Sequence, residues 1–462
     1  MNFLKLQLRN LFRTFARPIE LYLFMETVLI KAAQLFLSLS ILVLIHECGH
    51  FFFARLFKVR VEKFYLFFNP WFSLYKFVPR GSATEYGIGW LPLGGYVKIA
   101  GMLDESFDRE ALAQPPKPWE FRVKPSWQRL LIMVGGVLMN FILAFFIFSM
   151  MAFAWGEEFL PIKNVKMGYA FNEATLKAGF QTGDIPLAAD NVTLEYSDAL
   201  LSVFTAKEVT VLRNGEVVTI TLPPDFKNVV FDEEPNFVER FPFVVKNVMG
   251  GDPAQKAGLL AGDSIVGVNG EPNLSTYEIQ KLFAENKNKE IVLQLYRDNQ
   301  LLSLPVVPNE SGKIGVALKT DKEIYETNRV YYNFFTSIPA GIRIGMGTIK
   351  MYLSQFKFIF SKEGAKNIGG FGAIGNLFPS KWSWPDFWFM TAFLSIMLGI
   401  MNLLPIPALD GGHVLFLLYE VVSGRKPNEK FMEYAQIVGM ILVIALVLYA
   451  NGNDLFRWLK SR

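Results

Sequence analysis

The sequence LVLIHECGHFFFARLF, residues 42–57, places two histidines four positions apart inside a strongly apolar run. On a helix that spacing puts His46 and His50 on the same face, where both imidazoles can bind one zinc ion. Glu47 lies beside them and is the residue that this H-E-x-x-H pattern offers as a general base. Ionisable side chains are costly inside an apolar span and usually functional there. We therefore interpret the pattern as a metal site rather than as a chance match on a surface helix.

The apolar run belongs to the first of four long apolar stretches. Residues 130–155, 387–409 and 434–453 contain no charged residue, and residues 28–45 contain only Lys31. Each stretch approaches the roughly 20 residues that a helix needs to cross a bilayer. Hydrophobic residues make up 52% of the chain and charged residues only 19%, values outside the averages of soluble proteins. The sequence predicts a polytopic α-helical membrane protein with about four transmembrane helices, not a soluble protein with buried core helices.

Basic residues indicate which side of the membrane each segment faces. The segment from Arg55 to Arg129, with both ends included, contains twelve Lys or Arg, and three more, at 425, 426 and 430, follow the third span. By the positive-inside rule both segments are cytoplasmic, and the long region from 156 to about 385 lies outside. The net charge of +4 gives no indication of a nucleic-acid partner. A single cysteine, Cys48, excludes an internal disulfide framework. The sequence indicates no oligomeric state.

The first 24 residues fit this topology poorly. They contain Lys5, Arg9, Arg13 and Arg17, which favour a cytoplasmic N-terminus. We interpret residues 1–24 either as an extension before a true start at Met25 or as an amphipathic surface segment. A cleavable signal peptide fits less well, because the following apolar run is long and lacks a small-residue cleavage site.

A third metal ligand is expected from the distant sequence GIMNLLPIPALDGGHVLF, residues 399–416. Catalytic zinc normally takes three protein ligands and leaves a fourth position open. Asp410 ends a charge-free run and lies near the same end of its span as the two histidines do in theirs. We therefore expect Asp410 to be the third ligand. His413 is interpreted as a residue that supports the site, a competing ligand or a structural histidine. Cys48, two positions from His46, points away from the face that carries the ligands. We therefore expect Cys48 to have a packing role and not to bind the metal.

HECGH together with the distant NLLPIPALDGGH resembles the site-2 protease family, peptidase M50. The stretch GIGWLPLGGYVKIAGM, residues 87–102, resembles its bacterial RseP-type branch. The resemblance implies a zinc metalloendopeptidase with one catalytic zinc ion, ligands His46, His50 and Asp410, and Glu47 as the base. It also implies intramembrane cleavage of single-span anti-sigma factor-type proteins after a first cut, or of remnant signal peptides. The expected location is the bacterial inner membrane, with the active site toward the cytoplasm.

Cleavage within a bilayer requires a helical substrate to unwind and be held, since lipid offers its backbone no hydrogen bonds. Residues 85–99 are rich in β-forming residues and contain a glycine pair, which predicts a β-hairpin that turns at Gly94 and Gly95. Gly94, Gly95, Tyr96 and Val97 would bind substrate by strand addition. The alternative is an ordinary cytoplasmic hairpin. Asn402 is expected to bind unwound substrate, or else to satisfy a carbonyl freed by the prolines that follow it.

The region expected outside the membrane repeats itself. KAGFQTGD at 177–184 recurs as KAGLLAGD at 256–263, 79 residues later, and β-rich runs follow both copies. This predicts two tandem copies of one β-rich domain. Both resemble PDZ domains, the second more closely, and both are expected in the periplasm. A peptide would bind near residues 313–316, although we favour a size filter or substrate gate over a high-affinity peptide receptor.

Two other functions were considered: a catalytically inactive membrane PDZ scaffold and a zinc transporter. The intact Glu47 argues against the first, and four spans with paired outer domains argue against the second. The expected segments are an N-terminal extension (1–24), a transmembrane helix with HECGH (25–56), a cytoplasmic membrane-associated β-hairpin loop (57–129), a transmembrane helix (130–155), a first PDZ-like domain (156–236), a second PDZ domain (237–322), an interfacial amphipathic segment and linker (323–385), a transmembrane helix with NLLPIPALDGGH (386–420), a further transmembrane helix (432–453) and a tail (454–462).

Overall fold

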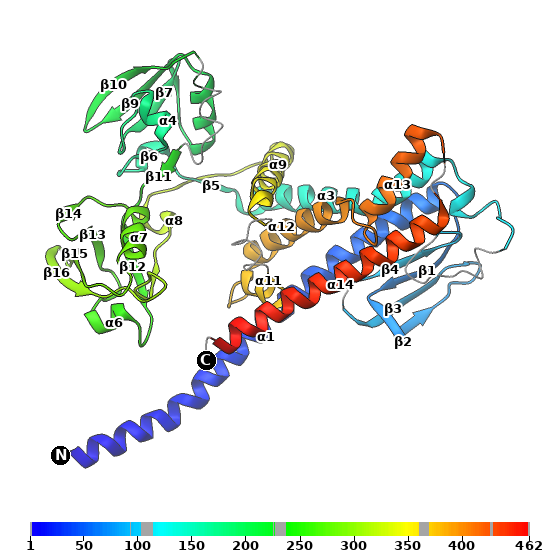
Figure 1. Cartoon of the computed structure of the whole chain (residues 1–462), viewed down its shortest axis with the longest axis horizontal. Coiled ribbons are helices and arrows are strands. Elements are labelled where there is room, and N and C mark those ends of the chain that lie inside the picture. Colours follow the sequence, from blue (N-terminus) through cyan, green and yellow to red (C-terminus); the bar gives the residue numbers. More distant parts are fainter. Residues whose placement is uncertain are drawn as a thin grey trace. The chain divides into compact units, whose positions relative to one another are not determined.

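The structure is a computed structural model that describes residues 2–92, 94–102, 114–224, 226, 237–359, 369–425 and 428–460. Before Met25 it describes the backbone alone. The chain forms two compact units: the first combines residues 1–156 with 331–462, and the second comprises residues 157–330 (Figure 1). The H-E-x-x-H motif and the distant LDGGH motif therefore lie in the same unit.

The first unit is mainly helical. Its helices are α1 (Asn2–Leu56), α3 (Ser126–Trp155), α9 (Phe334–Ile359), α11 (Phe371–Leu377), α12 (Trp384–Leu403), α13 (Asp410–Ser423) and α14 (Glu429–Lys460), with a 3-10 turn η1 (Phe121–Val123). Among the described residues, four helical stretches are long and apolar enough to cross a membrane: Met25–Leu56, Ser126–Trp155, Trp384–Leu403 and Lys430–Arg457. These agree with the four transmembrane helices that the sequence predicts. The expected interfacial segment contains α9, whereas residues 360–368 lie outside the described residues.

Helix α3 is the centre of this unit and packs against α1, α9, α12 and α13. Its contact with α1 depends on glycine, because a Cβ on Gly49 would lie 2.2 Å from the carbonyl oxygen of Gly135. The two backbones therefore touch at the level of the H-E-x-x-H motif. Further along α3, Phe148 is buried in an apolar cluster with Ile396 of α12.

A four-stranded sheet follows α1, and here the predicted hairpin is wrong. Its strands are β1 (Val61–Leu66), β2 (Phe68–Phe77), β3 (Glu85–Leu91) and β4 (Tyr96–Ile99), in the order β2-β3-β1-β4. Strand β1 lies between β3 and β4, parallel to β3 and antiparallel to β4. The glycine pair is needed for close packing instead of a two-residue turn: a Cβ on Gly95 would lie 2.7 Å from the Tyr65 carbonyl oxygen and 3.1 Å from Cγ of Glu47.

The segment expected as one helix over 386–420 is also different. Helix α12 ends at Leu403, and a separate helix, α13, begins at Asp410. Pro405 and Pro407 explain the interruption, since proline cannot donate a helical hydrogen bond and disfavours helical backbone in the residue before it. The break matters for function because it places Asp410 in the first turn of α13 instead of in the middle of one long helix.

The second unit contains two similar halves. The first half comprises β5 (Glu157–Phe159), η2 (Ile162–Asn164), β6 (Tyr169–Phe171), α4 (Glu173–Lys177), β7 (Ile185–Ala189), β8 (Val192–Thr193), η3 (Ser197–Thr205), β9 (Glu208–Arg213), β10 (Glu216–Thr221) and β11 (Phe237–Glu239). The second comprises β12 (Phe243–Val248), α6 (Pro253–Ala257), β13 (Ser264–Val268), β14 (Glu271–Pro272), α7 (Thr276–Glu285), β15 (Ile291–Arg297), β16 (Gln300–Val306) and β17 (Val316–Leu318), followed by α8 (Asp321–Ile324) and β18 (Asn328–Val330). Each half has its own buried apolar cluster.

Strand order and one buried ion pair confirm the internal repeat. The sheets run β10-β9-β7-β8 and β16-β15-β13-β12-β17, with β14 paired to β13 as β8 is to β7. In the first half Arg213 donates to Asp184 at 2.7 Å and to the Gly179 carbonyl at 2.8 Å. In the second half Arg297 makes the same two contacts, with Asp263 at 2.6 Å and the Gly258 carbonyl at 2.9 Å.

Candidate metal centre

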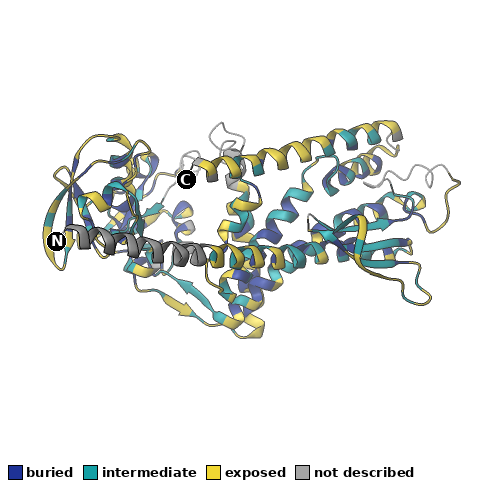
Figure 2. Cartoon of the chain, turned by 90° about the horizontal axis from the view of Figure 1, so that it is seen from below, coloured by how far each residue is buried: buried dark blue, intermediate teal, exposed yellow. Residues whose placement is uncertain are grey.

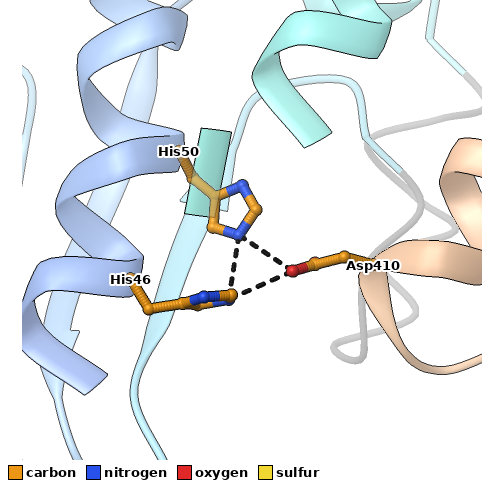
Figure 3. A group of neighbouring side chains, drawn as sticks. All are labelled: His46, His50 and Asp410. Carbon is orange, nitrogen blue, oxygen red and sulfur yellow. Dashed lines mark hydrogen bonds and ion pairs between the residues drawn. The ribbon is translucent and has the colours of Figure 1, made fainter. Parts of the chain in front are cut away.

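The structure brings together three sequence-predicted side chains from two helices. His46 and His50 project from α1, and Asp410 projects from the first turn of α13 (Figure 3). Oδ2 of Asp410 lies 3.1 Å from Nε2 of His46 and 3.4 Å from Nε2 of His50. The two Nε2 atoms are 3.2 Å apart. Among the described residues, this is the group of histidine, cysteine and carboxylate side chains close enough to share a metal ion.

The spacing of these three atoms fits a zinc ion. Tetrahedral zinc with ligands at about 2.0–2.1 Å separates those ligands from one another by about 3.3 Å, and the three observed distances lie close to that value. Oδ2 of Asp410 is buried and accepts no hydrogen bond from a described residue. A buried carboxylate oxygen that faces two imidazoles requires a cation. A zinc ion bound to all three would supply one and leave a fourth position open.

The orientation of His50 is set by helix α3. Its Nδ1 lies 2.8 Å from the carbonyl oxygen of Ile132, so Nδ1 carries the hydrogen and donates to that oxygen. Nε2 is then left with the lone pair that a metal requires. Such a partner on the far side of the ring is the usual way in which proteins fix the tautomer of a ligating histidine.

His46 has a comparable partner in Asn140, which sequence reasoning missed. The side-chain amide of fully buried Asn140 places its Nδ2 3.1 Å from Nδ1 of His46, and its oxygen has no partner among the described residues. An amide can present its oxygen or its nitrogen at the same point. With the oxygen facing Nδ1, Asn140 accepts the ring N–H and leaves Nε2 free for metal. The signal in the sequence was an amide inside a charge-free span, four residues after Gly136.

Gly136 leaves room for both imidazoles. A Cβ there would lie 2.4 Å from Nε2 of His50 and 2.8 Å from Nε2 of His46. Both distances are far below van der Waals contact, and the atoms concerned are the ones that face Asp410. Helix α3 therefore contributes in two ways: its Gly136 leaves space for the two rings, and its polar groups orient them.

Asp410 is delivered by a tight loop between α12 and α13. The Leu409 N–H donates to the Ile406 carbonyl at 3.0 Å, and Ala408 has φ +81°. With Pro407 before it, this is the pattern of a type II turn, whose third position normally requires glycine. Gly411 continues the compact path, since a Cβ on it would lie 2.1 Å from the Leu404 carbonyl oxygen.

A buried ion pair anchors the far end of the helix that carries Asp410. Arg129 of α3 donates to Glu420 of α13 at 2.5 Å, and each residue is 9% exposed. Ser126 also donates to Glu420, at 3.2 Å, and Arg129 donates to the Lys124 carbonyl at 2.9 Å. Nothing in the sequence indicated this pair, because its members are separated by 291 positions. It fixes α13 to the same helix that orients both histidines.

A cavity of about 820 Å³, called the site cavity below, opens beside the three ligand atoms. Its lining includes the predicted residues His46, Glu47, His50, Asn402, Asp410 and His413. Glu47 is 9% exposed and faces this space together with the ligands. Asn402, in the last turn of α12, hydrogen-bonds with no other described residue through its side chain. Cys48 is partly exposed and belongs neither to the lining nor to the ligand group.

Strand β4 forms another part of the wall. Gly95, Tyr96 and Val97 line the site cavity, whereas Gly94 does not. Tyr96 is held by a hydrogen bond to Asn69 at 2.9 Å and by stacking on Tyr65 at 5.3 Å between ring centroids. Because β4 is the last strand in the order β2-β3-β1-β4, one of its edges has no partner strand among the described residues.

Comparison with known proteins agrees with this arrangement. The model of peptidase family M50 matches residues 34–446. The chain is 30% identical to Protease RseP of Yersinia pestis, over 94% of this chain and 100% of that protein. It is 30% identical to Regulator of sigma-E protease RseP of Escherichia coli K12, over 92% and 98%. A relative from Ralstonia nicotianae, 25% identical over 91% and 97%, has the words zinc metalloprotease in its name.

The matched region includes His46, His50 and Asp410, whose facing atoms have the spacing that a zinc ion requires. The chain therefore belongs to peptidase family M50 and is a zinc metalloprotease.

Proposed function

We propose that the chain hydrolyses peptide bonds in or near the transmembrane helices of single-span proteins. His46, His50 and Asp410 hold the zinc ion, and Glu47 is the catalytic base. One observation carries this proposal: the three ligand atoms and the Glu47 carboxylate face the same cavity within a bundle of apolar helices. A carboxylate beside two imidazoles in an apolar helix is costly and is not needed for packing, so we assign it a catalytic role.

The mechanism assigns one task to each polar group. Zinc, when bound, supplies a Lewis acid that polarises the scissile carbonyl and lowers the pKa of water. Glu47 accepts a proton from the attacking water as its oxygen bonds to the carbonyl carbon. The same carboxyl group then gives that proton to the leaving amine nitrogen as the C–N bond breaks. Ile132 and Asn140 keep the two imidazoles in position throughout.

The outer edge of β4, which pairs with no other strand in the described part of the chain, is suited to holding unwound substrate. Strand addition would satisfy the N–H and C=O groups that a helix exposes when it unwinds, which lipid cannot do. Tyr96 and Val97 would supply those backbone contacts, and Gly95 brings the strand close to Glu47. Asn402 would bind the same segment through its side-chain amide.

The names of the relatives support a proposal for the substrates and the location. One relative is named Protease RseP and another Regulator of sigma-E protease RseP, so we propose anti-sigma factor-type proteins after a first cut, or remnant signal peptides. We place the chain in a bacterial inner membrane with the site cavity toward the cytoplasm. The two repeated halves of the second unit would then be periplasmic PDZ-like domains that screen substrates by size.

Replacement of Glu47 by Gln tests the function. Purified wild-type protein should contain zinc and cut a single-span model substrate in detergent or liposomes. The Glu47→Gln variant should retain zinc and lose cleavage by several orders of magnitude. An inactive scaffold would be indifferent to the change, and a transporter would show altered zinc flux instead. Equal cleavage by the two proteins would refute the proposal.

A further inference from the structure

Helix α14 is exposed along most of its length: Figure 2 shows the helix that leads to the C-terminus mainly in the colour of exposed residues. Its few buried residues include Gln436, Gly439 and Ala450. Two of its buried residues, Gln436 and Gly439, are three positions apart and lie on one face of the helix. An amide on the inward face of a largely lipid-exposed helix is unusual, because burial of a polar group without a partner is costly.

The position of this turn is fixed by the loop that delivers Asp410. A Cβ on Gly439 would lie 1.7 Å from the carbonyl oxygen of Pro407, so the helix backbone rests directly on that loop. Phe431, in the first turn of α14, also makes an edge-to-face contact with Phe416 of α13, with ring centroids 6.1 Å apart. These contacts turn the face that carries Gln436 toward the metal centre.

Gln436 is 5% exposed and lines the site cavity together with Glu47 and Asp410. Its side chain hydrogen-bonds with no other described residue. A leucine would occupy nearly the same volume with no polar atom. The amide atoms of Gln436 are not sealed off from the site cavity, so a partner in that cavity can reach them. Asn402 presents a second amide to the same space from α12, and this amide also lacks a partner among the described residues. Two such amides, from two helices, point to a ligand with both donors and acceptors.

We propose that Gln436 binds the backbone of the substrate segment held in the site cavity. This inference rests on the proposed function. A glutamine amide has donors and an acceptor, as a peptide unit does, so it can pair with an unwound segment whatever its side chains. Through Gln436, helix α14 helps to hold the substrate. Because the contact is with the substrate backbone, it is made with every substrate.

Kinetics provide the first test. Gln436→Leu removes the amide at nearly constant volume and should lower kcat/KM about tenfold, the equivalent of one hydrogen bond, mainly through KM. Its zinc content should equal that of wild type. Gln34→Leu is the matched control, because Gln34 is buried in α1 but donates to the Pro379 carbonyl at 2.9 Å, away from the cavity lining. It should leave kcat/KM within about twofold of wild type.

Cross-linking tests the contact without cleavage. In a background with Cys48→Ser and Glu47→Gln, Gln436→Cys should form a disulfide with cysteines placed next to the scissile bond of a model substrate. Val438→Cys, on the exposed face of the same helix, should not. Unchanged kcat/KM in Gln436→Leu together with no selective cross-link would overturn the inference while wild-type cleavage persists. Absence of wild-type cleavage would instead refute the proposed function.

Discussion

A methyl group on Gly136 would lie 2.4 Å from Nε2 of His50. Helix α3 therefore approaches the ligand-bearing face of α1 as closely as backbone can, and the same helix supplies the Ile132 carbonyl and the Asn140 amide that orient the two rings. The metal centre is thus built by three elements, although two of them carry all the ligands.

Gly136→Ala should remove zinc while the helix is retained. Alanine favours helix over glycine by about 1 kcal/mol, so a loss of metal would arise from the displaced imidazoles. We expect zinc affinity to fall at least tenfold, measured by competition with a chelator. Gly347→Ala in α9 is the control, since nothing lies within 4 Å of its Cβ position. Normal zinc binding by Gly136→Ala would show that the rings do not occupy this position.

Asn140→Leu should weaken zinc binding about 10–100-fold, the usual cost of removing a partner from a ligating histidine. Asn140→Asp should restore much of the loss, because a carboxylate can accept the Nδ1 hydrogen of His46. Thr391→Val is a suitable control: Thr391 is equally buried but bonds to the Phe387 carbonyl of its own helix. If leucine and aspartate at position 140 bind zinc equally well, Asn140 does not orient His46.

Removal of one member of the ion pair of Arg129 and Glu420 should lower the free energy of unfolding strongly, whereas removal of both should lower it little. Glu420→Leu alone leaves a buried arginine without its carboxylate, which costs about 3–5 kcal/mol. The double variant Arg129→Met with Glu420→Leu should recover most of that stability, because no charge remains buried. Thermal unfolding in detergent measures each variant. Additive losses in the double variant would mean that the two side chains act independently.

In the second unit, Asp263 should make stability depend on pH. Burial by itself would raise the pKa of its carboxyl, but hydrogen bonds from Arg297 and from the Leu260 N–H outweigh burial and lower the pKa below its ordinary value. A lowered folded-state pKa adds stability that is present above the unfolded value of about 3.9 and is lost as pH falls through the folded value.

A fragment of residues 240–320, which contains its own apolar cluster, allows this to be measured by urea unfolding. Wild type should lose stability as pH falls from about 5 to 2. Asp263→Asn should be less stable at pH 7 and show a smaller decline. The exposed Glu290→Gln serves as the control. A decline in Asp263→Asn as steep as in wild type would assign the pH dependence to other groups.

Local spacing and paired motifs were sufficient to predict that His46, His50 and Asp410 come together. His46 and His50 follow from a helical repeat, and Asp410 follows from a carboxylate at the end of an apolar span. The tandem repeat was visible as a constant 79-residue offset. These features depend on residues close in sequence or on segments that match one another, so a sequence displays them directly.

Long-range pairing could not be predicted in the same way. The insertion of β1 between β3 and β4 depends on which strand edges meet in three dimensions, and a glycine pair needed for close packing was interpreted as a turn. Asn140, Gln436 and the pair of Arg129 and Glu420 acquire their roles from helices that are distant in sequence. The prolines at 405 and 407 did indicate the break before Asp410, yet a single long helix was expected.

Zinc K-edge X-ray absorption on the purified protein shows whether His46, His50 and Asp410 bind one zinc ion. We predict about one zinc per chain, bound by two imidazole nitrogens and by oxygen at about 2.0–2.2 Å, with the oxygen contribution reduced in Asp410→Ala. A sulfur ligand at about 2.3 Å, which only Cys48 or a methionine could supply, or a spectrum unaltered by Asp410→Ala, would contradict the account.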